Sequence, residues 1–122
     1  MKIYLLSPYS HERESIRYWR WSMACEHAGK LMAAGFLVYS PIAHTHSIAV
    51  QHELPLNWEY WKALDTSFIR DWCDIGVILE LPGWRESVGV NAELQIFGRL
   101  GKRVYNWTHQ EDLPYGLKAR VR

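Results

Sequence analysis

Two acidic residues occupy positions where the sequence predicts apolar side chains. Glu93 falls within the apolar stripe of a helix predicted over residues 87–100, at the spacing of 3.6 residues per turn. Asp65 falls within the apolar stripe of a helix predicted over residues 57–72. A buried carboxylate is costly unless a partner or a reaction uses it. We therefore expect both acids to point inward, toward one cavity.

Two carboxyl groups that face one cavity suit chemistry at a glycosidic carbon. One attacks the anomeric carbon or stabilises its charge, and the other exchanges the proton of the leaving group. Glu93 is the nucleophile candidate because it lies in the early turns of its helix, where amide groups favour an anion. Aromatic neighbours should raise the pKa of Asp65, which suits a proton donor. The alternative for each acid is a purely structural pairing with an arginine or a backbone amide.

Further candidates lie near the predicted strand ends and helix starts. Tyr4 lies near the end of the first strand, where its hydroxyl could orient Glu93 or simply pack within the sheet. Ser87 and Gly89 open a helix whose amides suit an anion or a sugar hydroxyl, although a serine there is equally explained as an N-cap. The remaining candidates for substrate contact are Ser7, Pro8, Trp84 and His44.

Residues 42–56 are rich in histidine and show no regular period, which predicts a long loop of the kind that forms lids and binding sites. The segment carries His44, His46 and His52, but no cysteine or carboxylate completes a recognisable set of metal ligands. No metal site is therefore predicted, and these histidines are expected to face solvent or substrate.

The predicted elements alternate between strands and helices. This order predicts an α/β fold with a parallel sheet covered on both sides. Ligands of such sheets bind outside the carboxyl ends of the strands. No dinucleotide-binding or P-loop glycine motif is present. The predicted strands are 2–6, 36–39, 75–79 and 103–107, and the predicted helices are 11–34, 57–72 and 87–100.

Length and composition restrict the possibilities further. The 122 residues suit a single domain, 1–122, and residues 108–122 form either a terminal loop or an arm that reaches a neighbouring subunit. A net charge of +1 does not favour binding to polymeric nucleic acid. Without a membrane-length apolar run or a signal peptide, and with Cys25 and Cys73 interpreted as buried thiols, a cytoplasmic location is expected. The seven tryptophans and seven tyrosines suit a core, a stacked flat ligand or an oligomer interface.

Several short motifs together resemble the nucleoside 2-deoxyribosyltransferase superfamily, including its 2′-deoxynucleoside 5′-phosphate N-hydrolase branch. The likeness covers about residues 2–107 and is greatest to small uncharacterised bacterial and phage members. The motifs are Ile3-Tyr4-Leu5, Asp65, Cys73-Asp74, Leu81-Pro82-Gly83-Trp84, Ser87-x-Gly89-x-x-x-Glu93 and Gly101-Lys102.

The resemblance implies a flavodoxin-like three-layer sandwich with a parallel sheet of four to five strands. It implies N-glycosidic bond cleavage or deoxyribosyl transfer on a deoxynucleoside or deoxynucleotide, without a metal or organic cofactor. Glu93 would be the nucleophile that forms a covalent intermediate, Asp65 the acid and Tyr4 the residue that orients Glu93. Ser87 would contact a 5′-phosphate. The resemblance also implies a homo-oligomer in which a neighbouring chain helps to close the site.

Two other functions remain open at this point. One is a non-catalytic module that binds a nucleotide or nucleotide-sugar in the same cavity. The other is a partner-binding domain whose aromatic residues form an interface. The sequence alone does not decide the base, the phosphate preference, or whether water or a second base accepts the sugar.

Overall fold

The computed structural model describes residues 1–118 of the chain. Strands and helices alternate along the sequence, as predicted, with one additional helix between the second and third strands. The elements are β1 (Lys2–Leu6), α1 (Glu14–Ala33), β2 (Leu37–Tyr39), α2 (Pro41–His52), α3 (Trp58–Asp71), β3 (Ile75–Leu79), the short 3-10 helix η1 (Trp84–Glu86), α4 (Val88–Leu100) and β4 (Val104–Trp107).

The strands form one four-stranded sheet in the order β2-β1-β3-β4, and every neighbouring pair is parallel. All five residues of β3 are buried, which its continuous apolar sequence suits as a central parallel strand. The chain goes from β1 to β2 on one side and then returns to β3 on the other side of β1. The strand order therefore reverses between β1 and β3, the position where α/β sheets open a ligand crevice.

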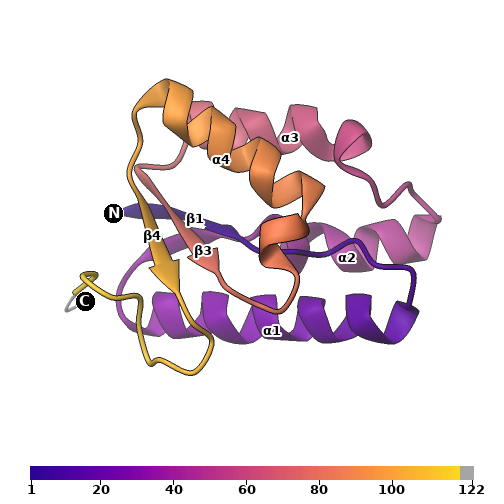
Figure 1. Ribbon diagram of the computed structural model, residues 1–122, viewed down its shortest axis with the longest axis horizontal. Coiled ribbons are helices and arrows are strands. Elements are labelled where there is room, and N and C mark those ends of the chain that lie inside the picture. Colours follow the sequence, from indigo (N-terminus) through magenta and orange to yellow (C-terminus); the bar gives the residue numbers. More distant parts are fainter. Residues whose placement is uncertain (119–122) are drawn as a thin grey trace.

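Helices cover both faces of this sheet, and the predicted α/β flavodoxin-like sandwich is confirmed. Figure 1 shows α1 on one face and α3 with α4 on the other. Each face has its own apolar cluster. Ile3, Leu5 and Val77 pack on the α1 side, whereas Tyr4 and Leu6, which alternate with them along β1, pack on the α3–α4 side.

The prediction of a long loop over residues 42–56 is wrong, because most of this segment is helix α2. Ser40 caps the helix by accepting a hydrogen bond from the Ala43 amide at 3.1 Å, and Pro41 occupies the first turn, where its missing N–H costs nothing. The buried face consists of Pro41, Thr45 and Ala49 at a spacing of four residues. These side chains are small or polar, so they form a helical stripe that hydropathy does not reveal.

Cys73 is buried, but Cys25 is exposed, which corrects the interpretation of both as buried thiols. In the described part of the tail, Leu113 and Leu117 pack against the α1-side cluster of the same chain. The tail residues Arg120 and Arg122 lie outside the described residues. Within residues 1–118, no helix is long and apolar enough to cross a membrane.

Candidate active site

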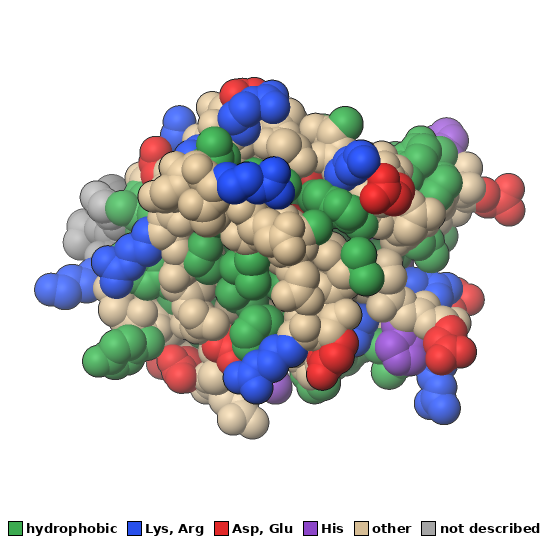
Figure 2. All heavy atoms as spheres, turned by 45° about the horizontal axis from the view of Figure 1, so that its top comes forward, with side chains coloured by type: hydrophobic (Ala, Val, Ile, Leu, Met, Phe, Trp, Pro, Cys, Tyr) green, Lys and Arg blue, Asp and Glu red, His purple; other side chains and the backbone are tan. Residues whose placement is uncertain are grey.

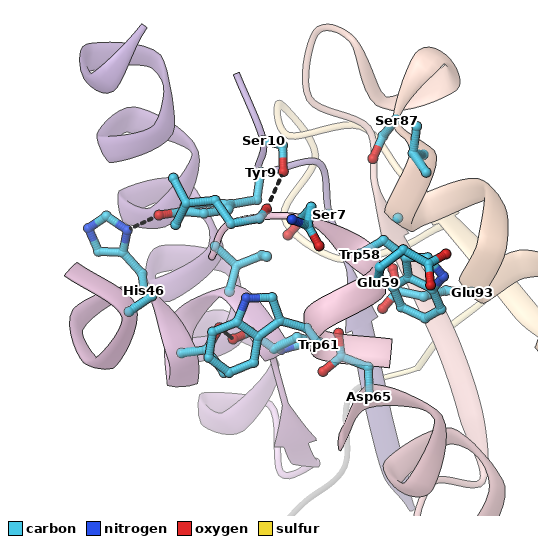
Figure 3. A pocket seen from close by; sticks show the side chains of 18 of the residues that line it. Ser7, Tyr9, Ser10, His46, Trp58, Glu59, Trp61, Asp65, Ser87 and Glu93 are labelled. Atoms are coloured by element: carbon cyan, nitrogen blue, oxygen red, sulfur yellow. Dashed lines mark hydrogen bonds between the residues drawn. The ribbon is translucent and has the colours of Figure 1, made fainter. Parts of the chain in front are cut away.

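A cavity of about 380 Å³ opens at the carboxyl end of the sheet, where the topology predicts a ligand site. The segment after β1, helix α2 and the starts of α3 and α4 form its wall, as Figure 3 shows. Its volume lies toward the small end of the roughly 300–1,000 Å³ typical of small-molecule sites. The wall includes the polar residues Ser7, Ser10, Thr45, Asn57, Glu59, Asp65, Glu86, Ser87 and Glu93 and the aromatic residues Tyr9, His46, Trp58 and Trp61.

Asp65 from α3 and Glu93 from α4 both line this cavity, and both are buried, with 6% and 5% of their surface exposed. The Tyr4 hydroxyl, fully buried on β1, donates a hydrogen bond to Oε2 of Glu93. Within residues 1–118, neither acid takes part in an ion pair or accepts a hydrogen bond from a backbone amide. The two acids are therefore not paired with an arginine or a backbone amide, which was the structural alternative for their inward position.

Burial controls the protonation of the two acids. It raises the pKa of Asp65 to about 7. It also raises the pKa of Glu93 well above the usual value, with a further contribution from the charge of Asp65, while the Tyr4 hydrogen bond opposes this rise. Oδ1 of Asp65 is buried without a hydrogen-bond partner. The hydrogen bond from Tyr4 stabilises a negative charge on Glu93, and Asp65 receives no such bond in the described chain, while the two buried acids titrate as one coupled pair.

The two helices that carry the acids are capped and joined at their ends. Asn57 caps α3 by accepting from the Tyr60 amide at 3.0 Å. Ser87 caps α4 by accepting from the Val90 amide at 3.2 Å. At the opposite end, Nζ of Lys102 donates to the carbonyls of Ile69, Arg70 and Cys73 at 2.5, 3.1 and 2.7 Å, which ties the end of α4 to the end of α3.

The structure gathers some of the predicted substrate contacts and not others. Ser7, Ser87 and Gly89 line the cavity. The Ser7 hydroxyl is buried and has no hydrogen-bond partner within the described chain, so it is available to a ligand. The three remaining candidates, Pro8, Trp84 and His44, are not part of the wall.

These three residues have other surroundings in the structure. Pro8 is buried just beyond β1. Trp84 packs against the apolar cluster on the α3–α4 side, and the Arg85 guanidinium lies 5.1 Å from the centre of its ring. His44 is exposed and contacts the Tyr39 ring, with the ring centres 5.8 Å apart.

An aromatic wall that the sequence did not predict lies opposite the two acids. The Tyr9 hydroxyl and Nδ1 of His46 are hydrogen-bonded at 2.6 Å, and His46 stacks on Trp21 with ring centres 4.8 Å apart. Burial and the nearby charge of Arg17 lower the pKa of His46, so its ring is neutral at pH 7. Figure 3 shows Tyr9 and His46 on one side of the cavity and Glu93 on the other.

Trp61 contributes a fixed aromatic surface to the same cavity, because its Nε1 donates to the Pro55 carbonyl at 2.8 Å. Signals for these residues were present in the sequence, as a histidine-rich segment and a tryptophan-rich helix start. Without the helical spacing of α2, they could not be assigned to one wall. Among residues 1–118, no three potential ligand side chains are grouped to hold a metal ion.

The fold and the cavity together define the class of protein: an α/β sandwich with a cavity at the carboxyl end of its sheet that two buried acids line. A family model described as "Domain of unknown function (DUF1937)" matches residues 1–109, and the chain belongs to this family. A search of curated proteins finds no match. The family description specifies no reaction.

Proposed function

We propose that the protein cleaves the N-glycosidic bond of a deoxynucleoside or deoxynucleotide, with Glu93 as nucleophile and Asp65 as acid. The observation that carries the proposal is the convergence of these two buried carboxyl groups, from different helices, on one cavity. A glycosidic carbon is a chemical target that uses one charged and one protonated carboxyl group together. The resemblance to the nucleoside 2-deoxyribosyltransferase superfamily supports the same assignment of roles.

The proposed reaction uses a charged Glu93 and a protonated Asp65. The Glu93 carboxylate attacks C1′ of the deoxyribose, and the bond between C1′ and the base nitrogen breaks with its electrons going to the base. Asp65 gives its proton to the base, which leaves neutral. The deoxyribosyl group is then an ester of Glu93. Water or a second base attacks C1′, Glu93 leaves as a carboxylate, and Asp65 takes up the proton that the acceptor releases.

The rest of the cavity supports this assignment. Trp61 supplies a fixed indole beside the acids, and Tyr9 with His46 supplies a neutral hydrogen-bonding pair farther along the wall. Flat heteroaromatic rings bind well to such surfaces, because stacking and a few placed polar groups act together. A nucleobase leaving group has this shape and chemistry.

The test is release of free base from the four common deoxynucleosides and their 5′-monophosphates, followed by chromatography. We expect at least one member of this panel to be cleaved. Glu93→Gln should lower the rate by about a thousandfold or more, since it removes the nucleophile. Asp65→Asn should lower the rate by about a hundred- to ten-thousandfold, the usual contribution of a general acid.

Asp71→Asn is the matched control, because Asp71 lies on the same helix but is exposed and paired with Arg70 at 2.9 Å. This variant should retain full activity. A non-catalytic nucleotide- or nucleotide-sugar-binding module would instead bind members of the panel without releasing base. That outcome, or cleavage that survives Glu93→Gln, would refute the proposed reaction.

A further inference from the structure

The described wall of the cavity contains no lysine or arginine, although it contains four acidic residues. Asp65 and Glu93 are the reacting pair, while Glu59 and Glu86 are exposed residues nearer the solvent. Oε2 of Glu59 forms an ion pair with Nζ of Lys62 at 2.8 Å. Glu86 forms no ion pair within residues 1–118. A ligand that carries a phosphate would therefore lose hydration without gaining a cation from this wall.

The start of α4 is the part of the wall where an anion would ordinarily bind. Here the Ser87 hydroxyl already accepts from the Val90 amide at 3.2 Å. Glu86, which directly precedes this cap and also lines the cavity, places its own negative charge beside the helix start. The favourable field of the helix is thus partly offset by a charge of the protein itself, and a second anion would be repelled.

A buried cation, Arg20, lies close by but faces a neighbouring cavity, which it shares with Glu86 and Ser87. Its guanidinium group already donates to the carbonyls of Ser10 and Pro82 at 2.9 and 3.0 Å. It also occupies the space beside Gly83, where an added Cβ would lie 2.7 Å from Nη2. Arg20 therefore joins the segment after β1 to the segment after β3, which explains its burial without a ligand.

Three hydroxyl groups of the wall can form hydrogen bonds with uncharged sugar hydroxyls. The Ser7 hydroxyl is buried without a partner. Ser10 donates to the Leu56 carbonyl at 2.6 Å and Thr45 to the Pro41 carbonyl at 2.8 Å, which leaves their lone pairs available as acceptors. Free sugar hydroxyls can donate to these oxygens, whereas a fully ionised phosphate cannot.

We infer that the substrate is an unphosphorylated deoxynucleoside and that Glu86 is a residue that discriminates against the 5′-monophosphate. This inference rests on the proposed function for the identity of the ligand. It decides between the two substrate classes that the sequence left open. It also assigns to Glu86 a role in specificity that is separate from the chemistry of Asp65 and Glu93.

The experiment compares dissociation constants for 2′-deoxyadenosine, thymidine and their 5′-monophosphates, measured by calorimetry on the full-length protein with Glu93→Gln to prevent turnover. We expect at least one nucleoside to bind about tenfold or more tightly than its monophosphate. Glu86→Gln, added to this protein, should lower the ratio of the monophosphate dissociation constant to the nucleoside dissociation constant by about two- to tenfold. This is the effect of removing one nearby like charge. Glu14→Gln is the control, because Glu14 is exposed on α1 and lies outside both cavities, and the ratio should not change.

Equal or tighter binding of the monophosphates would overturn the inference, as would the absence of any nucleoside binding at millimolar concentration. If Glu86→Gln leaves the preference for the nucleoside over its monophosphate unchanged, Glu86 does not have the proposed role. These outcomes are distinct from failure of the proposed reaction. A nucleoside that binds selectively but is never cleaved by the unmodified protein refutes the reaction alone, whereas efficient cleavage of monophosphates refutes only the inference made here.

Discussion

Asp65 is a buried acid whose Oδ1 has no hydrogen-bond partner within the described chain, so its burial should destabilise the fold whenever it is charged. Its pKa is raised to about 7 in the folded protein, against about 3.9 in an unfolded chain. The folded state therefore retains a proton that the unfolded state releases between these values. The associated stability is present below about pH 4 and is lost as the pH rises toward 7.

Asp65→Asn removes this pH dependence, and we expect the variant to be more stable than the unmodified protein at pH 8. The advantage should grow by about 2–4 kcal/mol between pH 5 and pH 8, from roughly 1.4 kcal/mol for each pKa unit. Urea unfolding of both proteins at pH 5 and pH 8 measures this difference in the free energy of unfolding. An advantage that is equal at both values would mean that Asp65 is not the buried, proton-binding acid described above.

Tyr4 should act on the reaction through Glu93 without contacting the substrate, since it lies behind the wall of the cavity. Tyr4→Phe removes a hydrogen bond to a charged group, typically about 1.5–3 kcal/mol. We expect kcat to fall by about ten- to a hundredfold, with KM nearly unchanged. Steady-state kinetics on a cleaved deoxynucleoside provide both values.

Tyr39→Phe is the matched control for this substitution. The Tyr39 hydroxyl is buried without a hydrogen-bond partner in the described chain, and burial, together with the charges of Asp65 and Glu93, raises its pKa. Its loss should leave kcat unchanged, because it breaks no bond to either acid. Equal losses in both variants would instead indicate a general effect of the buried tyrosines on packing.

At the scale of single residues, the sequence predicted the inward position of an acid better than the position of a histidine. Asp65 and Glu93 stood out because each interrupts an apolar stripe, and a helical period is enough to orient them. His44 and His46 are only two residues apart, about 200° around a helix. The helix places His46 in the wall and His44 in solvent, and a segment predicted as a loop gave no means of choosing between them.

At the scale of elements, the approach of α4 to the sheet depends on a glycine. A Cβ added to Gly76 on β3 would lie 2.8 Å from the Phe97 ring and 3.1 Å from Leu6. Phe97 is one turn beyond Glu93 on α4, so this contact fixes how deeply the helix and its acid sit. Gly76→Ala should therefore destabilise the protein by about 1–3 kcal/mol through overpacking and should lower kcat by displacing Glu93.

Gly98→Ala is the control on α4, because an added Cβ there meets no atom within 4 Å. This change should stabilise the protein by about 0.5–1 kcal/mol, since alanine favours a helix interior over glycine. Thermal unfolding of both variants provides the comparison. A stable and fully active Gly76→Ala protein would contradict the packing described for α4.

The sequence predicted the strands that are buried on both faces, but it did not predict a helix that has only a narrow buried face. The strands at 2–6 and 75–79 match the prediction residue for residue, because a central parallel strand is apolar on both faces. Helix α2 was missed because Pro41, Thr45 and Ala49 form only a narrow buried face. The missing helix also concealed the aromatic wall, since His46 is part of α2 and contacts Tyr9 on the same side of the cavity.

At the scale of the whole molecule, the parallel sheet brings the carboxyl ends of β1, β2 and β3 to one edge. Residues far apart in the chain, such as Ser7, Asp65 and Glu93, therefore line one cavity. Figure 2 shows basic and acidic side chains interspersed over one face of the molecule, in keeping with a net charge of +1. Discrimination against a phosphate must then come from charges local to the cavity, such as Glu86, and not from the overall field.

The most direct measurement of the central claim is mass spectrometry of the protein mixed rapidly with a cleaved deoxynucleoside and quenched in acid. We predict a mass increase of one deoxyribosyl group, mapped by proteolysis to the peptide that contains Glu93 and absent from Glu93→Gln. Release of free base with no adduct at Glu93, or with an adduct on another residue, would contradict the assignment of Glu93 as the nucleophile.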